Sequence, residues 1–308
     1  MSRRTNRLAL LAKIETTYGT DPTPSGSADA IQASNVEFTP MAGDDVTRDL
    51  LLAYYGHQGV LLTNDHVRMA FDVEIAGAGT AGDVPAWGVL MRACAMVEAI
   101  TANTSVAYTP RSAGEEAATL YYNLDGVNHV LAGARGNVQL NFNAKQIPRF
   151  RFTMTGLKGS IADTALPTVD LSDFVTPVPV SAAQTTARLH GHDLIAESFS
   201  VDVGNVVTPE DLIGLNEVEF NDRMTTGTAT VRARALSDIN WFTIAQNRTR
   251  AALDFAHGRT AGNIVEMDAP AVEIGRPTQG NTNNRATYQL PMMMIPNTGN
   301  DELVITVK

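Results

Sequence analysis

In the stretch VRMAFDVEI, residues 67–75, every second residue carries a large apolar side chain. An extended chain would place five apolar side chains on one side, those of Val67, Met69, Phe71, Val73 and Ile75. Asp72 and Glu74 would lie on the other side. Because successive side chains of a strand point to opposite faces, the pattern predicts a strand with one buried and one wet face.

The same alternation recurs farther along the chain. In one further segment the polar residues at alternate positions are Gln139, Asn141 and Asn143. In another they are Glu217 and Glu219. A third such segment covers 228–234. Sheets with one wet face are usually antiparallel, so we expect antiparallel sheets.

Two helix patterns interrupt the strands, at 83–100 and 237–247. Asp83 is the expected cap of the first helix, and Ser237 or Asp238 that of the second. The apolar face expected for the first helix is made by Trp87, Leu90, Met91, Cys94 and Val97. Helices are few, so the fold class expected from the residues is mainly β.

The order of these patterns repeats: six segments of the first part of the chain have matches, in the same order, in the second part. The first set is VTRDLL (46–51), the strand 67–75, the Trp87 helix, AATLYYNLDG (117–126), GNVQLNF (136–142) and RFRFTMTG (149–156). The second set is VTPEDLI (207–213), the strand 228–235, the Trp241 helix, AALDFAHG (251–258), GNIVEMD (262–268) and ATYQLPMM (286–293). We therefore expect a duplicated domain: an N-terminal arm (1–35), domain 1 (36–157), a Pro/Ser/Thr-rich linker (158–188) and domain 2 (189–308).

The composition excludes several classes of protein. A net charge of −10 and a pI of about 5.0 argue against a protein that grips nucleic acid through its phosphates. The single cysteine, Cys94, excludes an internal disulfide framework. The chain has no apolar run long enough to span a membrane, and the apolar run LALLA (8–12) is too short for a signal peptide. We expect synthesis in the cytoplasm.

GAGTAG (77–82) matches the glycine pattern of a dinucleotide-binding loop. The strand before it alternates, however, whereas strands of a parallel α/β sheet are apolar on both faces. The second copy also replaces the loop with ALSD (235–238), which has no glycine. We interpret the loop as a flexible connection of variable length and expect no nucleotide site.

Other candidates for chemistry are isolated. His190 and His192, beside Asp193, would share one side of a strand and could reach one metal ion, but we interpret them as a polar strand face at the start of domain 2. Cys94 lies on the apolar face of its expected helix, which indicates packing. We expect neither an enzyme nor a bound cofactor or metal.

Several segments resemble the tail tube (major tail) proteins of long-tailed, non-contractile bacteriophages of the siphovirus type. They are LLAKIETTYGTDPTPSGSADAI (10–31), SNVEFTP (34–40), VEIAGAGTAGDVPAWGVLMRAC (73–94), YYNLDGVNHVLAGARGNV (121–138), IPRFRFTMTGL (147–157) and DRMTTGTATVRA (222–233). The resemblance covers nearly the whole chain. It implies β-sandwich or β-barrel domains, each flanked by a helix, in rings that stack into a hollow tube through which DNA passes.

The resemblance also implies partners. Single-domain members form rings of six, so a duplicated chain is expected to form a trimer with pseudo-sixfold symmetry. Other copies of the chain, a tape-measure protein inside the tube, tail terminator and distal tail proteins at its ends, and double-stranded DNA in transit are the expected partners. The expected location is the virion tail, assembled in the host cytoplasm without a membrane.

Within such a tube, the polar strand faces are candidates for the lumen. The candidate residues are Asp72, Glu74, Gln139, Asn141, Asn143, Glu217 and Glu219. An outer, solvent-facing position would explain the same pattern. The loop 41–63, with Tyr54, Tyr55 and His57, is the expected contact with the adjacent ring.

Two alternatives belong to other classes. A secreted or surface β-sandwich adhesin would need an export signal, which the residues do not suggest. An NAD-binding enzyme would rest on the glycine loop alone.

Overall fold

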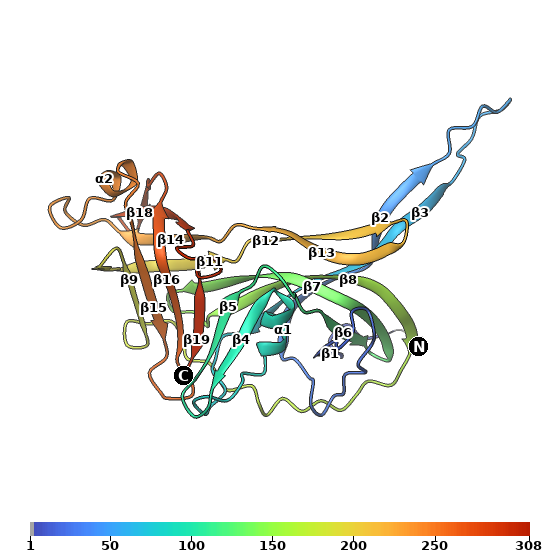
Figure 1. Ribbon diagram of the computed structural model, residues 1–308, viewed down its shortest axis with the longest axis horizontal. Coiled ribbons are helices and arrows are strands. Elements are labelled where there is room, and N and C mark those ends of the chain that lie inside the picture. Colours follow the sequence, from blue (N-terminus) through green and yellow to red (C-terminus); the bar gives the residue numbers. More distant parts are fainter. Residues whose placement is uncertain (1–2) are drawn as a thin grey trace.

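The computed structural model describes residues 3–308. Its first half contains β1 (Leu8–Ile14), β2 (Ala33–Thr47), β3 (Val60–Glu74), α1 (Gly88–Ala93), β4 (Met96–Thr101), β5 (Ser105–Pro110), β6 (Ala118–Leu124), β7 (Val127–Asn143) and β8 (Arg149–Asp163). Its second half contains β9 (Thr185–Leu189), β10 (His192–Asp193), β11 (Ala196–Asp202), β12 (Asn205–Leu212), β13 (Leu215–Arg223), β14 (Thr226–Arg232), α2 (Trp241–Gln246), β15 (Arg250–His257), β16 (Val265–Ile274), β17 (Thr278–Thr282), β18 (Arg285–Met294) and β19 (Val304–Val307). The fold is mainly β, as expected (Figure 1).

The two halves have the same strand order. The first half pairs its strands as β1-β6-β7-β8-β3-β2, and the second as β9-β15-β16-β18-β14-β11. Every pairing is antiparallel. β11 of the second half corresponds to β2 of the first. β16 and then β17 pair with successive parts of β18, so β17 corresponds to the carboxyl-terminal part of β7.

A shared irregularity fixes the correspondence residue by residue. The third strand of each order carries a β-bulge, between Leu131 and Ala134 in β7 and between Ala269 and Val272 in β16. A bulge inserts one residue at a defined place in a ladder, so matching the two bulges makes Ala134 the counterpart of Val272. The strand registers then assign the counterparts of all neighbouring residues.

Two connections join the halves into one 17-stranded sheet. β7 pairs directly with β11, and β5 pairs with β19, which also pairs with β16. The β4–β5 hairpin has no counterpart in the second half, where α2 leads directly to β15. In Figure 1 the second half stands at the left, with β4, β5 and β19 between the halves.

The buried face of β3 confirms the alternation of 67–75. Val67, Met69, Phe71, Val73 and Ile75 are all buried. Phe71 packs against Phe152 of β8, with ring centroids 5.7 Å apart. Trp87 lies against Phe150 at 4.8 Å, and its indole N–H donates to the Ala76 carbonyl oxygen at 2.8 Å. The aromatic cluster holds α1 onto the sheet.

Both helices are shorter than expected. α1 covers only Gly88–Ala93, so the predicted helix 83–100 is wrong at both ends, and the expected cap Asp83 lies outside the helix. α1 ends at Ala93 because Ala95 adopts a φ of 58° and the chain turns into β4. Val97, Ile100 and Thr101 are β-branched, which favours the strand. The cap of α2 is Asn240, whose side chain accepts from the Thr243 N–H, and not Ser237 or Asp238.

Three expected segments take different forms. The segment expected as an N-terminal arm contains β1, which is buried and pairs with β6. The linker expected at 158–188 begins inside β8 and ends inside β9. Only residues 164–184 lie between these strands, and they form turns and irregular chain. GNIVEMD (262–268) starts β16 before the bulge, so it matches an earlier part of β7 than GNVQLNF.

Candidate functional site

The joint between β7 and β11 is built in two layers. On the buried side, Phe255 of β15 stacks on Phe199 at 4.7 Å and contacts Phe142 at 4.5 Å. On the polar side, Asn137 donates to Asp202 at 2.7 Å. The ladder itself places Asn141 opposite Ser200. Aromatic packing on one side and paired residues along the ladder together make this a stable seam between the two halves of the sheet.

β2 and β17 each keep one edge free. Within residues 3–308, β2 pairs only with β3, and β17 pairs only with β18. β2 is the counterpart of β11 and β17 that of the carboxyl-terminal part of β7. The chain therefore presents at its two ends the two members of a seam like β7–β11. Unpaired N–H and C=O groups on such edges are templates for another strand.

Charged side chains lie in rows across the polar face of the first half. Asp72 accepts from Arg151 at 3.1 Å and lies 3.9 Å from Arg149. Glu74 also lies 3.9 Å from Arg149, and Glu37 of β2 pairs with Arg151 at 2.7 Å. Three carboxylates thus meet two guanidinium groups. The sequence analysis missed both arginines, although they alternate with Phe150 and Phe152 in RFRF.

The polar rows continue from one half into the other. Directly opposed residues of neighbouring strands share a face. One row runs through Glu74, Arg149, Asn141, Ser200 and Thr228. A second runs through Asp72, Arg151, Gln139, Asp202 and Thr226, and Asn143 lies opposite Ser198 at the end of β7. Five of the seven candidate lumen residues therefore share one face, which becomes rich in hydroxyl groups in the second half.

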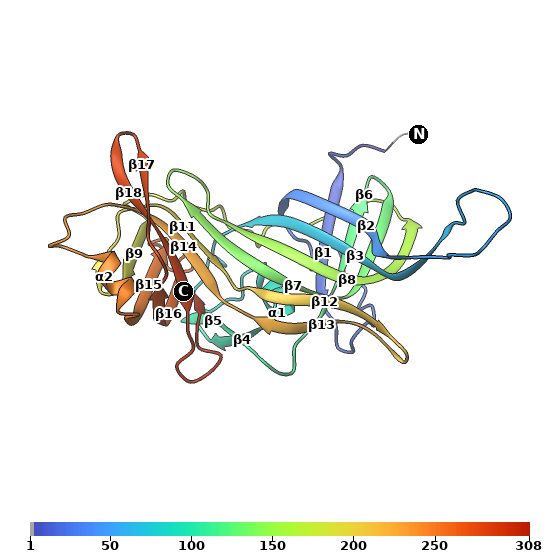
Figure 2. The same ribbon diagram turned by 90° about the horizontal axis from the view of Figure 1, so that it is seen from above.

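The other two candidates, Glu217 and Glu219, lie elsewhere. They belong to β13, in a separate two-stranded sheet with β12. Their side chains share a hydrogen bond that raises the pKa of Glu217. Figure 2 shows the β12–β13 hairpin running beside β7 across the first half.

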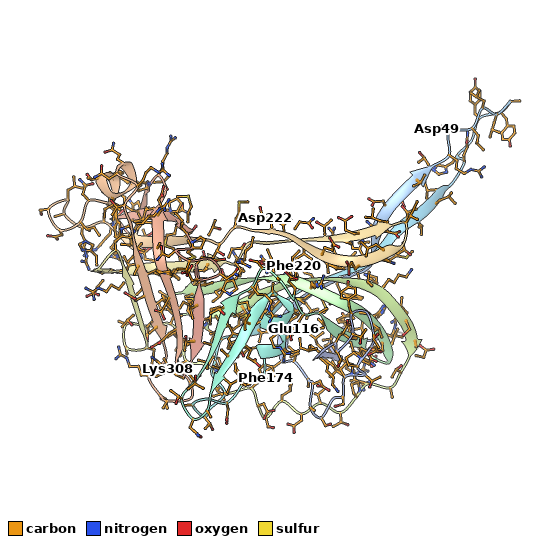
Figure 3. All side chains as sticks on the ribbon, in the orientation of Figure 1. Asp49, Glu116, Phe174, Phe220, Asp222 and Lys308 are labelled. Atoms are coloured by element: carbon orange, nitrogen blue, oxygen red, sulfur yellow. The ribbon has the colours of Figure 1, made fainter. Side chains whose placement is uncertain are left out.

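Arg135 of β7 holds this hairpin in place. Its guanidinium donates to the Val218 carbonyl oxygen at 2.6 Å and lies over the rings of Tyr18 and Phe220. The Val218 N–H donates to the Tyr18 hydroxyl at 2.6 Å, and burial raises the pKa of that tyrosine. Val218 is fully buried. Figure 3 shows Phe220 between β13 and the sheet beneath it.

The β2–β3 hairpin, which we call the arm (41–66), projects away from the body (Figure 1). Its tip is closed by Gln58, which exchanges two hydrogen bonds with the backbone of Leu50, and by the Gly59 N–H, which donates to His57 Nδ1. Leu51 and Tyr55 are completely exposed, and Tyr54 is largely exposed. The β12–β13 tip is similarly apolar, since Ile213 is completely exposed. Asp49, far from the body in Figure 3, marks the start of the arm tip.

Residues 5–294 match the model of a family described as phage tail tube protein. This chain belongs to that family. No match was found among curated proteins. The tail tube assignment favours the tube-forming hypothesis over an adhesin, and it makes the chain a structural component of a phage tail. Over residues 3–308, none of the helices is both long and apolar enough to cross a lipid bilayer.

The glycine loop of the tail tube chain is an internal contact between its halves. The Gly77 N–H donates to Asn263 Oδ1 at 2.7 Å, and the Gly79 N–H donates to the Gly262 carbonyl oxygen at 2.8 Å. These are the amides that a phosphate loop would offer to its ligand. A Cβ on Gly77 would overlap the Gly262 carbonyl. The loop therefore uses glycine for close packing, and the expected flexible connection is wrong.

Substituting Gly77 with alanine is expected to lower the melting temperature by several degrees. The new methyl group would force two backbone segments apart, which costs about 1–3 kcal/mol. Calorimetry measures the shift. Gly56→Ala is the matched control, because nothing lies within 4 Å of a Cβ at Gly56. Equal melting temperatures for both variants would contradict the close packing.

The histidines and the cysteine have structural partners. His190 lies in the turn between β9 and β10, not on a shared strand face with His192, and its Nε2 lies 2.8 Å from the Val272 carbonyl oxygen. Burial lowers the pKa of His190 and raises that of Cys94. Among the described residues, no three His, Cys, Asp or Glu side chains gather closely enough to hold a metal ion.

Proposed function

We propose that three copies of this tail tube protein close into a ring with pseudo-sixfold symmetry, and that the rings stack into the hollow tube of a siphovirus-type tail. The seam between β7 and β11 carries the proposal. It joins two halves of identical strand order, and the free edges of β2 and β17 are its missing members. Repeating this seam around an axis pairs the free edges of β2 and β17, as closure of a barrel pairs its end strands.

The register of the ring seam follows from the register inside the chain. β11 and β7 place Ser198, Ser200 and Asp202 opposite Asn143, Asn141 and Gln139. Because β2 corresponds to β11 and β17 to the carboxyl-terminal part of β7, we expect the same register between neighbouring copies. It gives three opposed pairs: Ser34 with Thr282, Glu37 with Gly280, and Thr39 with Thr278. Glu37 is mainly exposed in the single chain, so a neighbouring strand can reach it.

The polar rows face the lumen in this ring, with Asp72, Glu74, Gln139, Asn141 and Asn143 among them. The buried face of the same sheet is occupied by the core, so only the polar face is free to line a channel. Paired charges and hydroxyl groups give a nearly neutral wall with a small acidic excess. Such a wall releases few counterions from DNA and does not hold it, so double-stranded DNA slides through without sequence-specific binding. Glu217 and Glu219 lie outside these rows, on the β12–β13 hairpin.

The hairpin tips are the proposed contacts between rings. Tyr54, Tyr55 and His57 lie at the tip of the arm, where apolar side chains are exposed beyond the body. An exposed apolar tip is a binding surface for another protein. The family assignment supports a tape-measure protein inside the growing tube, terminator and distal tail proteins at its ends, and assembly in the host cytoplasm.

A disulfide across the ring seam tests the closure. With Glu37→Cys and Gly280→Cys, oxidation should yield covalent trimers on a non-reducing gel, because opposed residues of antiparallel strands lie within disulfide range. Asn141→Cys with Ser200→Cys is the positive control, since this pair is opposed inside one chain. The native Cys94 is buried and stays out of the reaction. A chain that remains monomeric, with the control disulfide formed, would contradict ring closure.

A further inference from the structure

We infer that the arm of each copy docks on the second half of the next copy in the same ring, in the place where β12–β13 docks on the first half. The inference rests on the proposed ring. It starts from a difference between two equivalent hairpins. β12–β13 is packed against the body by Arg135, Tyr18 and Phe220, whereas the arm stands free.

The two hairpins leave equivalent strands. β14 and β3 are counterparts, and the strand registers make Thr230 the counterpart of Asp72. From this pair we count back the same number of residues towards each hairpin. Val60 is then the counterpart of Val218, and Leu62 is the counterpart of Phe220. Val218 is fully buried under its hairpin, but Val60 is 41% exposed and Leu62 is 55% exposed. The arm therefore carries the apolar contact residues of a docked hairpin without the surface that covers them.

A matching surface exists on the second half. The seat of β12–β13 on the first half includes Arg135, which donates to the Val218 carbonyl oxygen, and Gly136, whose carbonyl oxygen accepts from Asn205. Thr155 of β8 lies opposite Arg135 in the ladder. Their counterparts are Glu273 and Ile274 of β16 and Met293 of β18. Thr155 is buried, whereas Met293 is 39% exposed. Glu273 is already paired there with Arg248 and Arg250, so the free part of this surface is Met293. In the ring Met293 would face the exposed valine and leucine of the arm, and flexible methionine side chains adapt well to such contacts.

The direction of the arm brings it to this seat. β12–β13 leaves the second half and runs over the first, and the arm leaves the first half and continues away from the second (Figures 1 and 2). In the ring, the β2 edge meets β17, so the second half of the next copy lies on that side. The base of the arm, residues 60–66, then covers β16 and β18 of the neighbour. The tip, residues 50–58, remains available for the adjacent ring.

Photocrosslinking from the arm tests this placement. Leu62 is replaced with p-benzoylphenylalanine in a chain that lacks residues 50–58 and carries the Glu37→Cys and Gly280→Cys seam. Without the tip the covalent rings do not stack, so every crosslink between copies is made inside one ring. We expect mass spectrometry to find crosslinks to residues 273–276 or 291–295 of another copy, and Met293→Glu to remove most of them. The same photoreactive group at Phe220 is the control and should crosslink to the same chain near Arg135.

The outcomes separate the two levels of the proposal. Covalent trimers whose Leu62 probe crosslinks to other segments, or forms no crosslink to another copy, would overturn the docking of the arm and leave the ring standing. Absence of covalent trimers would overturn the ring itself. Crosslinks to the seat that survive Met293→Glu unchanged would also contradict the docking, because a buried carboxylate at that contact is strongly unfavourable.

Discussion

Deletion of residues 50–58 is expected to abolish tube formation while leaving a folded, soluble chain. The tip holds Leu51, Tyr54 and Tyr55, whose side chains are exposed in the single chain. Burying one such side chain contributes about 1.5–3 kcal/mol, so three of them on each of three arms dominate the contact between rings. Nothing in the core depends on them.

The deletion is also compatible with the backbone. β2 ends at Thr47 and β3 begins at Val60, so Arg48, Asp49 and Gly59 would form a three-residue loop. Gly59 already has a φ of 80°, the left-handed conformation that such hairpin loops require at their last position. Circular dichroism and melting temperature should therefore be close to those of the intact chain.

Negative-stain microscopy at high protein concentration measures the result. We expect tubes from the intact chain and only single rings or monomers from the deletion. A chain with Leu51→Ser, Tyr54→Ser and Tyr55→Ser keeps the length of the arm and should behave like the deletion, because the contact depends on apolar surface. Tubes of normal length from the deletion would sink the assignment of the tip to ring stacking.

Reversing the charge of the polar rows is expected to slow DNA ejection strongly. Asp72→Arg with Glu74→Arg leaves Arg149 and Arg151 without carboxylate partners on β3 and raises the net charge by four per chain. A basic wall binds phosphates by releasing counterions, so the passing DNA would be held at every ring. The side chains stay on the exposed face of β3, and the tube is expected to assemble.

The lumen assignment is tested with phage particles built from the variant chain. The rate of ejection is measured as the amount of DNA released over time. The delay should shrink steeply as salt is raised, because counterion release weakens with ionic strength. Asp83→Arg with Asp173→Arg is the matched control, with the same change in charge at exposed positions off the polar face. Ejection at the intact rate and without salt dependence would place Asp72 and Glu74 outside the lumen.

The sequence predicted the parts of this fold that depend on local alternation. The period of two in VRMAFDVEI is sufficient to identify β3 and its buried face, because each side chain follows the pleat of its own strand. The repeated order of motifs predicts two similar halves, and corresponding strands occupy corresponding places in the two strand orders. The lumen candidates on β3 and β7 share one face because their alternation and the strand registers agree.

The missed features depend on contacts between distant residues. α1 ends early because the segment from Met96 pairs with β5, and strand pairing overrides the helical spacing of Val97. The role of Gly77 depends on Gly262, which lies far away in the sequence. Arg149 and Arg151 were visible as alternating residues, but their pairing with Asp72 and Glu74 needed the register of β3 with β8.

The seam inside the chain also changes how a ring begins to form. A ring of three chains has six seams, and three of them are complete as soon as each chain has folded. Tethering makes those three seams intramolecular, at an effective concentration far above that of free protein in a cell. Only three seams remain to form between chains, so the rate at which the first ring nucleates depends on a lower power of the protein concentration than it would for six separate domains. The two halves are also free to diverge, which lets one hairpin serve its own chain and the other its neighbour.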